Sequence, residues 1–395
     1  MKKNLSVLVI FLLVSSFGFS KNFFSERVFE IKTNIPASAS NNVFSLDEIL
    51  TENLVIDLRK IAGKVPKEGV IFTTIFDPSF SINLNIASVH TGVDFGLEGT
   101  ERFTLSKDIF DFFGYGNQIG EELNIAFNNY TDLYIYINAR LQFDIKECSV
   151  KIMPSLFVPL FTSSGVAGSF SSVNTEEGNL ILKMQTDLVY YSNFDIEEPL
   201  SMIDAALFNK AGVDLTGEAG FPINDMASLR VGGRVPIVPG RINTASYVTM
   251  NYLIDTSVTG IADTEIQSDE LTVVTSETVY YSNRPLKASA YMDIAPMGDA
   301  VTFSFGGGVG IMHPFTPEML IYPEYYLDVK FCLADMLKAC VSTEYTDQVF
   351  KHQVSAGFNL RFVEIDAGIS FQSASMTKSF AGTGMGGFVT ACVGF

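Results

Sequence analysis

Residues 131–145 read TDLYIYINARLQFDI, and their strict two-residue alternation decides the fold. Apolar side chains occupy every odd position from Leu133 to Ile145, whereas Tyr, Asn, Arg, Gln and Asp occupy the even positions. Because successive side chains of a β-strand point to opposite faces, this stretch predicts one apolar face and one polar face. Thirteen residues at about 3.3 Å each span roughly 40 Å, or about 30 Å when the strand is tilted by ~40°. The strand is therefore long enough to cross a bilayer.

The same rhythm returns near the C-terminus. Residues 350–362 and 363–371 both alternate in this way, and together they predict a hairpin. A tight turn at Phe362-Val363 places Arg361 opposite Glu364 on the polar side and both apolar rows on the other side. Weaker alternation marks residues 229–237, 286–294, 301–311 and 321–331. From about residue 70 onward we count roughly 12 to 16 such segments, and we expect an even number near 14.

The composition favours a membrane barrel over a helical membrane protein. No run of about 18 apolar residues follows residue 20, so transmembrane helices are excluded. The chain is nevertheless rich in apolar and aromatic residues, with 34 Phe, 15 Tyr and 31 Gly. A lipid-facing barrel reconciles this content with few helices, because its backbone is hydrogen-bonded from strand to strand. The sequence therefore predicts an all-β, transmembrane antiparallel β-barrel of about 14 strands.

The N-terminus carries the features of an export signal. Lys2 and Lys3 form a basic region, Leu5–Phe17 is apolar, and Gly18-Phe19-Ser20 offers small residues for cleavage after Ser20. The apolar run is too short to span about 30 Å of hydrocarbon as a helix. We expect a signal peptide at 1–20 and localisation in the cell outer membrane of a diderm bacterium. Loss of the two lysines changes the formal net charge from −18 to −20, which argues against a nucleic-acid partner.

An amphipathic helix is predicted ahead of the barrel. Ser45 and Glu48 form a capping box, apolar residues follow at helical spacing over 46–62, and Gly63 supplies a stop. Two interpretations are open: a plug or hatch inside the lumen, and a periplasmic helix on the rim. The chain is accordingly divided into a signal peptide (1–20), an N-terminal plug or periplasmic helical segment (21–66) and the barrel (67–395).

Several shorter features are placed in loops or at the membrane surface. Residues Ser106–Phe113 and Pro199–Asn209 predict short helices. The pentapeptide Val-Tyr-Tyr-Ser-Asn occurs at 189–193 and again at 279–283. Paired tyrosines suit the aromatic girdle at the edge of a membrane barrel.

Four cysteines, at positions 148, 332, 340 and 392, raise the question of disulfides in an exported chain. If Cys332 and Cys340 flank a turn at Ala334-Asp335, they lie opposite Leu337 and Val329 and not opposite each other. We expect all four to be small apolar residues of the wall. A long-range bridge remains open.

The chain ends in an alternating strand that closes with Phe395, which resembles the C-terminal signal that the barrel assembly machinery reads. Together with the N-terminal helix, the roughly 14 strands and Asn34-Ile35-Pro36-Ala37, this terminus resembles the long-chain fatty-acid transporter-like outer-membrane barrels. Those transporters carry Asn-Pro-Ala near the start of their hatch, whereas here Ile35 is inserted. The resemblance implies diffusion of hydrophobic molecules through a plugged barrel, with a lateral exit as one possible route.

The sequence predicts no enzyme. Gly382-x-Gly384-x-x-Gly387 matches a dinucleotide fingerprint only formally, because the chain ends in a strand and no helix follows. Nucleophile-elbow, P-loop and zinc-protease motifs are missing from the sequence, and its three histidines lie far apart. We predict no catalytic, cofactor-binding or metal-binding residue. A scattered Ser/His/Asp site at the barrel rim is the remaining enzymatic hypothesis.

Charged residues on the polar faces are the candidate lumen-facing site. They are Arg140, Asp144, Arg230, Arg234, Asp328, Lys330, Arg361, Glu364 and Asp366. Their mixed signs fit paired wall residues as well as a selective pore. The predicted function is passive passage of small hydrophobic molecules, and the alternative is a surface-exposed structural or adhesive barrel with a closed lumen. Expected partners are outer-membrane lipid, the barrel assembly machinery and hydrophobic small molecules.

Overall fold

A computed structural model describes most of the chain, namely residues 27–45, 57–86, 89–145, 148–163, 165–176, 178–194, 209–257, 260–317, 319–333 and 336–395. The predicted signal peptide, the capping residue Glu48 and nearly all of the predicted helix at 199–209 lie outside these residues.

The described strands form one antiparallel sheet of 20 hydrogen-bonded strands, and β15 is a further short strand beside β16. The strands are β1 (Phe29–Asn41), β2 (Val70–Phe76), β3 (Ser79–Ile86), β4 (Val89–Leu105), β5 (Glu122–Ile145), β6 (Cys148–Ser163), β7 (Val166–Asn174), β8 (Asn179–Ser192), β9 (Gly212–Asn224), β10 (Ala227–Val238), β11 (Gly240–Ser257), β12 (Gly260–Ser268), β13 (Thr272–Ser282), β14 (Leu286–Ile294), β15 (Pro296–Asp299), β16 (Val301–Met312), β17 (Leu320–Leu333), β18 (Leu337–Thr346), β19 (Val349–Asn359), β20 (Val363–Ser373) and β21 (Gly384–Gly394). The helices are α3 (Leu58–Lys64), α4 (Lys107–Tyr115) and α5 (Met376–Ser379).

The sheet closes into a barrel because its first and last strands pair. β1 runs against β21 from Glu30 opposite Gly394 to Ser40 opposite Gly384. Several strands are pieces of one longer crossing: β2 with β3, β6 with β7, β8 with β9, β10 with β11, and β12 with β13 and β14. With each interrupted strand counted once, the wall has fourteen crossings, as the sequence predicted.

The wall is apolar outside and polar inside. On β5, Leu141 is 43% exposed on the outer face, whereas Tyr134 and Tyr136 are buried on the inner face. The large exposed side chains of the other strands are mainly Phe, Ile, Leu and Val, and carboxylates such as Asp214 are buried. This arrangement is the reverse of a water-soluble protein and is that of a transmembrane barrel. Among the described residues, no helix has the length and apolar content needed to cross a membrane.

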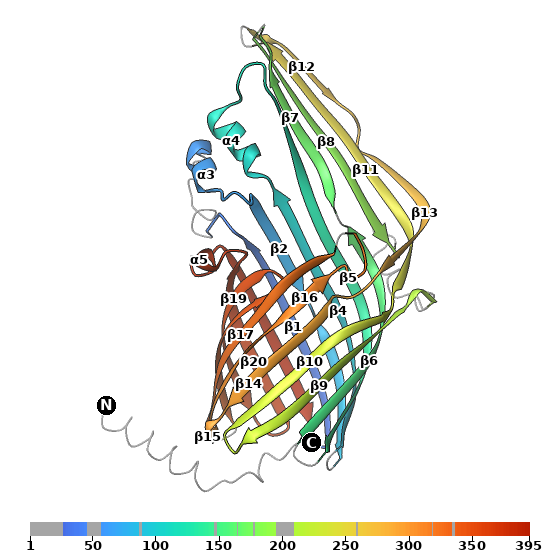
Figure 1. Cartoon of the computed structure of the whole chain (residues 1–395), viewed down its shortest axis with the longest axis vertical. Helices are drawn as coiled ribbons and strands as arrows, with labels where there is room; N and C mark the ends of the chain where they lie inside the picture. Colours follow the sequence, from blue (N-terminus) through green and yellow to red (C-terminus); the bar gives the residue numbers. More distant parts are fainter. Residues whose placement is uncertain are drawn as a thin grey trace, which may run out of the picture.

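The two ends of the barrel differ (Figure 1). The end that carries Phe395 and the start of β1 has short connections, such as those between β9 and β10 and between β19 and β20. We name it the turn end. At the opposite, loop end, β7, β8, β11, β12 and β13 rise beyond the rest of the wall, and all three described helices lie near this end.

The domain boundary predicted from the sequence is wrong over residues 29–41. These residues form the wall strand β1, between β21 on one side and β2 with β3 on the other, and not a separate plug or periplasmic segment. The strand FEIKTNIPASASN carries small Ala, Ser and Thr residues where other strands carry large apolar ones. Its alternation is therefore too weak to see in the sequence. Deletion of residues 21–66 would open the ring and could not test a plug.

The described part of the predicted helix lies outside the wall. α3 starts at Leu58, where the Lys60 amide donates to Asp57 Oδ1 at 3.0 Å, and residues 46–56 lie outside the described part. α3 and α4 pack on the wall near Val70 and Leu105, which are cross-strand partners. Because side chains alternate between the two faces of a strand, Val70 and Leu105 point to the same face as the exposed Phe72. This is the outer face of the wall, opposite to the lumen. For α3, the interpretation as a plug inside the lumen is therefore wrong, whereas the periplasmic-rim interpretation stays a prediction.

Other local predictions have mixed outcomes. The helix expected at Ser106–Phe113 is α4, with Ser106 as its N-cap. The two Val-Tyr-Tyr-Ser-Asn copies meet across β11, and the rings of Tyr191 and Tyr280 stack with centroids 4.1 Å apart. At the turn end, Phe395 and Phe29 exchange two backbone hydrogen bonds of 3.0 Å. Recognition of Phe395 by an assembly machinery stays a prediction.

All four cysteines are free thiols. Cys332 lies opposite Lys338 and Cys340 opposite Lys330, one residue away from the predicted register, so the two are indeed not partners. Two thiols are not apolar wall residues, which corrects the sequence prediction. Cys340 Sγ donates to Asp328 Oδ1 at 2.6 Å, and the buried Cys392 accepts a bond from Arg27.

Candidate functional site

Most of the predicted lumen charges lie inside the barrel in close pairs. Arg140 reaches Asp94 at 2.6 Å, Arg230 reaches Asp293 at 2.5 Å, and Arg234 reaches Glu98 at 2.8 Å. Glu364 pairs with Lys338 and Arg27, and Asp328 accepts the thiol of Cys340. The lumen wall is thus lined by paired charges of both signs.

The other four predicted residues lie toward the turn end of the wall, and Arg361 lines a polar cavity there. Arg361 is in the turn between β19 and β20, at φ 67°, and Asn359 takes the place opposite Glu364. The predicted hairpin register is therefore wrong, because the Leu360 amide donates to the Val363 carbonyl at 2.7 Å and the turn is Arg361-Phe362, one residue earlier than predicted. Asp144 and Lys330 are exposed, and Asp366 is half-buried beside Gly357.

A dense charge cluster crosses the lumen where the sequence predicted only Arg234. Glu98 accepts two bonds of 2.8 Å from Arg234 and is 2.6 Å from Arg284. Arg284 also reaches Asp214 at 3.0 Å and lies 4.5 Å from the centre of the Tyr136 ring. The polar position of Glu98 in the alternation of β4 could have identified it. Arg284 stands between two strands, where no periodic signal exists.

Two connections at the loop end fold inward over this cluster. Asp347, between β18 and β19, accepts a bond of 2.6 Å from Tyr322 and lies 3.1 Å from Lys287. His313, between β16 and β17, is buried and lies 3.4 Å from Asp132 on β5. Side chains from opposite walls therefore meet inside the barrel and divide its interior.

Three cavities result. The loop-end cavity, of about 380 Å³, lies among Arg102, Tyr130, His313, Met319 and Gln348. The middle cavity, also about 380 Å³, is lined by residues from β1, β18, β19, β20 and β21, and by Asp77. The turn-end cavity, of about 340 Å³, is polar on every side, with lining residues Arg27, Glu30, Asn83, Asn85, His90, Thr91, Arg140, Gln142, Asn359 and Arg361.

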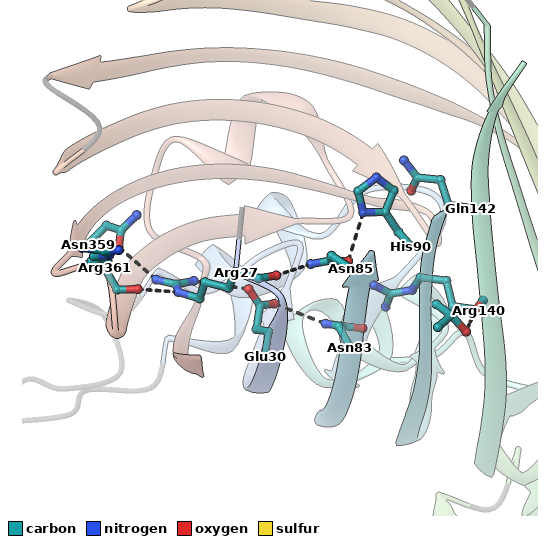
Figure 2. A pocket seen from close by; sticks show the side chains of 10 residues that line it. Arg27, Glu30, Asn83, Asn85, His90, Arg140, Gln142, Asn359 and Arg361 are labelled. Carbon is teal, nitrogen blue, oxygen red and sulfur yellow. Dashed lines mark hydrogen bonds and ion pairs between the residues drawn. The ribbon is translucent and has the colours of Figure 1, made fainter. Parts of the chain in front are cut away.

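Figure 2 shows how Arg27 crosses the turn-end cavity. Its guanidinium donates to the Arg361 carbonyl at 2.8 Å, to Asn359 Oδ1 at 2.9 Å and to Glu30 Oε2 at 3.2 Å. It thereby ties the start of β1 to the turn between β19 and β20, while Arg140 and Gln142 lie on the far side (Figure 2). An apolar molecule that left by this end would have to cross fully polar surroundings, which costs free energy.

The wall is interrupted between β2 and β3. β1 pairs with β3 as far as Asn34 opposite Ser79, and pairing resumes with β2 at Ala37 opposite Phe76. Asp77 and Pro78 fill the gap. Pro78, like Pro36 opposite the gap, has no N–H to donate to the ladder. Pro36 lies opposite Asp77 in the register, and one backbone hydrogen bond still spans the gap, from the Asp77 amide to the Pro36 carbonyl at 3.4 Å, whereas the Pro78 carbonyl accepts from Leu97 on β4. The two prolines therefore leave this stretch of the wall weakly paired.

An apolar groove of about 570 Å³ lies on the outer face of this break. Its lining residues are Thr33, Asn34, Ile35, Pro78, Ser79, Phe80, Phe95, Gly96, Leu97, Ile135, Tyr136, Ile137, Leu156 and Val158. A Cβ at Gly96 would lie 2.4 Å from the Tyr136 hydroxyl, so only glycine lets that ring approach the wall here. Asp77 lines the middle cavity on the inner side. At this point the polar interior and the apolar exterior are separated by a weakly paired stretch of wall.

One Ser/His contact exists among the described residues. Ser379 Oγ on α5 lies 2.8 Å from His352 Nε2, and Thr343 is 3.1 Å from the other ring nitrogen. Ser379 is 0% exposed, and its hydroxyl donates to the Met376 carbonyl at 2.6 Å. A substrate has no access to this hydroxyl, and no carboxylate orients the histidine in this contact, so the pair lacks the geometry of a nucleophilic site.

No protein-family model matches the sequence, and no curated protein matches it significantly. Solved structures similar to this chain include the P. putida toluene transporter TodX, at 8% identity and a TM-score of 0.47, over 94% of this chain and 91% of that one. The Ralstonia pickettii toluene transporter TbuX follows at 6% identity, TM-score 0.47, and coverage of 94% and 90%. A Pseudomonas aeruginosa FadL homologue is similar at 11% identity, TM-score 0.43, and coverage of 94% and 91%. Likeness at this level says nothing of a family or a substrate.

Proposed function

We propose that this chain is an outer-membrane barrel through which small hydrophobic molecules pass, entering at the loop end and leaving sideways through the wall. The observation that carries the proposal is the weakly paired stretch at Asp77-Pro78, with the middle cavity on its inner side and the apolar groove on its outer side. We call this stretch the wall break. A molecule that leaves there enters lipid without crossing the polar turn end. No feature of the described residues favours the adhesive alternative.

The orientation follows from the connections. In bacterial outer-membrane barrels the short turns face the periplasm and the longer loops face outward. We therefore assign the turn end, with Phe395, to the periplasm and the loop end to the cell exterior. The route then starts outside the cell at the loop-end cavity and ends in the hydrocarbon of the outer membrane.

Closing the break is expected to reduce uptake several-fold. The double variant P36V/P78V restores two backbone donors and places β-branched residues of high strand propensity in the gap, so the ladder can continue. Uptake of radiolabelled toluene is measured in diderm cells that lack other hydrocarbon transporters, at equal amounts of folded barrel in the outer membrane.

Pro323→Val is the matched control. Pro323 lies on β17 opposite Val309, within a ladder that continues on both sides, so its replacement leaves the wall as it was. We expect this variant to take up toluene at the wild-type rate. If P36V/P78V also takes it up at the wild-type rate, lateral exit through the break is wrong.

A further inference from the structure

The turn Thr346–Val349, which joins β18 to β19, occupies the lumen in an unusual backbone conformation. Asp347 has φ 50° and Gln348 has φ 65°, both in the left-handed region. Two-residue hairpin turns of this kind favour Asn-Gly or Asp-Gly, because glycine has no side chain to strain. A glutamine in this position therefore carries a conformational cost that contacts of its own side chain have to offset.

Both central residues are held by side chains from other strands. Asp347 Oδ1 is 2.6 Å from the Tyr322 hydroxyl on β17 and 3.1 Å from Lys287 Nζ on β14. The amide oxygen of Gln348 accepts a hydrogen bond from Arg102 on β4. β4 is far from β14 and β17 around the ring, so these contacts fix the turn from two sides.

The turn stands where two cavities meet. Asp347 lines both the loop-end cavity and the middle cavity. Thr100 and Ile75 are cross-strand partners in the wall, yet Thr100 faces the loop-end cavity and Ile75 the middle cavity. A molecule that moves from one cavity to the other therefore has to displace the turn.

The two attachments differ in strength. The inward arginines Arg140, Arg230, Arg234 and Arg284 each have a carboxylate partner within 3.0 Å. Among the described residues, Arg102 has no carboxylate partner, and its hydrogen bond goes to the neutral amide of Gln348. The other amide atom, Gln348 Nε2, is buried without a hydrogen-bond partner. A bond to a neutral acceptor is weaker than an ion pair, so the Gln348 attachment is the one that releases first.

We propose that the turn Thr346–Val349 is the gate of the lumen: Asp347 holds it closed through Lys287 and Tyr322, and it opens by release of Gln348 from Arg102. This inference rests on the proposed function, since it names the moving part of the same route. Opening joins the loop-end cavity to the middle cavity and thus to the wall break. The gate needs only a local change in one hairpin.

The first test measures the ion conductance of the purified barrel in planar lipid bilayers. Asp347→Asn keeps the size of the side chain but removes the charge that attracts the turn to Lys287, which keeps its other partner Glu324 at 3.1 Å. We expect the open fraction to rise about tenfold, which corresponds to about 1.4 kcal/mol for a lost part-buried charge pair. Glu344→Gln is the matched control, because Glu344 is paired with Lys351 at 3.0 Å on the same hairpin and does not hold the turn. If Asp347→Asn and Glu344→Gln show equal conductance, the turn is not the gate.

The second test locks the gate. In a background with serine at the four cysteine positions, Arg102→Cys and Gln348→Cys are joined by a short bis-thiol reagent that carries a reducible bond. We expect toluene uptake to fall at least several-fold on tethering and to recover on reduction. If the untethered protein takes up toluene and tethering leaves the uptake unchanged, the turn is not the gate. The proposed function would then still stand. If the unlocked barrel takes up no toluene, the proposed function fails, and the conductance of Asp347→Asn still decides whether the turn closes the lumen.

Discussion

Replacing Arg284 with methionine is expected to lower the free energy of unfolding by about 3–5 kcal/mol, the usual loss when one member of a buried ion pair is removed. The guanidinium lies between Glu98, at 2.6 Å, and Asp214, at 3.0 Å, and its side chain is only 6% exposed. In the variant, Glu98 keeps Arg234, but the fully buried Asp214 loses its cation. A buried carboxylate without a partner accounts for most of the loss.

The measurement is equilibrium unfolding in urea of the barrel refolded into lipid vesicles. Circular dichroism follows the transition, because the chain contains no Trp for fluorescence. The double variant R284M/D214N should recover part of the stability, since the orphaned charge is removed with its partner.

Arg230→Met serves as the matched control for Arg284→Met. Arg230 also forms an ion pair inside the barrel, with Asp293 at 2.5 Å, but its side chain is 38% exposed. Water can solvate the partner that remains, so we expect a loss of about 1 kcal/mol or less. If both arginine variants lose the same stability, water reaches the two pairs equally and the central cluster is not a dry constriction.

Placing an arginine on the outer face, by Val354→Arg, is expected to destabilise the barrel by about 2–4 kcal/mol in lipid. Val354 lies in the middle of β19, between Val341 and Ile369, and is 57% exposed in the absence of lipid. In a membrane this exposure is to hydrocarbon, which cannot solvate a guanidinium. The same urea titration in lipid vesicles measures the loss.

The neighbouring residue gives the control. Gln353 points to the lumen, where it lies opposite Ser342 and Ser370 and lines the middle cavity. Gln353→Arg therefore adds the same charge to a polar surrounding, and we expect a loss below about 1 kcal/mol. A larger loss for Gln353→Arg than for Val354→Arg would mean that the apolar rows face inward, and the membrane assignment would be false.

The sequence by itself determined the wall. The alternation of β5 and of the hairpin near the C-terminus is local, since the face to which a side chain points depends only on its position along a strand. It was therefore sufficient to predict an apolar exterior, a polar interior and about fourteen strands. It failed at β1, where small residues leave little contrast between the faces, and at Arg361, where a turn residue at positive φ shifts the hairpin register.

Only the tertiary structure decided which charges meet and where the wall is weakly paired. Glu98, Asp214 and Arg284 come from distant parts of the chain, and they converge because closure of the ring puts their strands on facing sides of one lumen. Pro36 and Pro78 each mark a missing donor in the sequence, but they weaken the same stretch of wall only because β1 runs beside β2 and β3. Periodicity fixes the direction of a side chain relative to its own strand, whereas its partner depends on how the complete ring of strands closes.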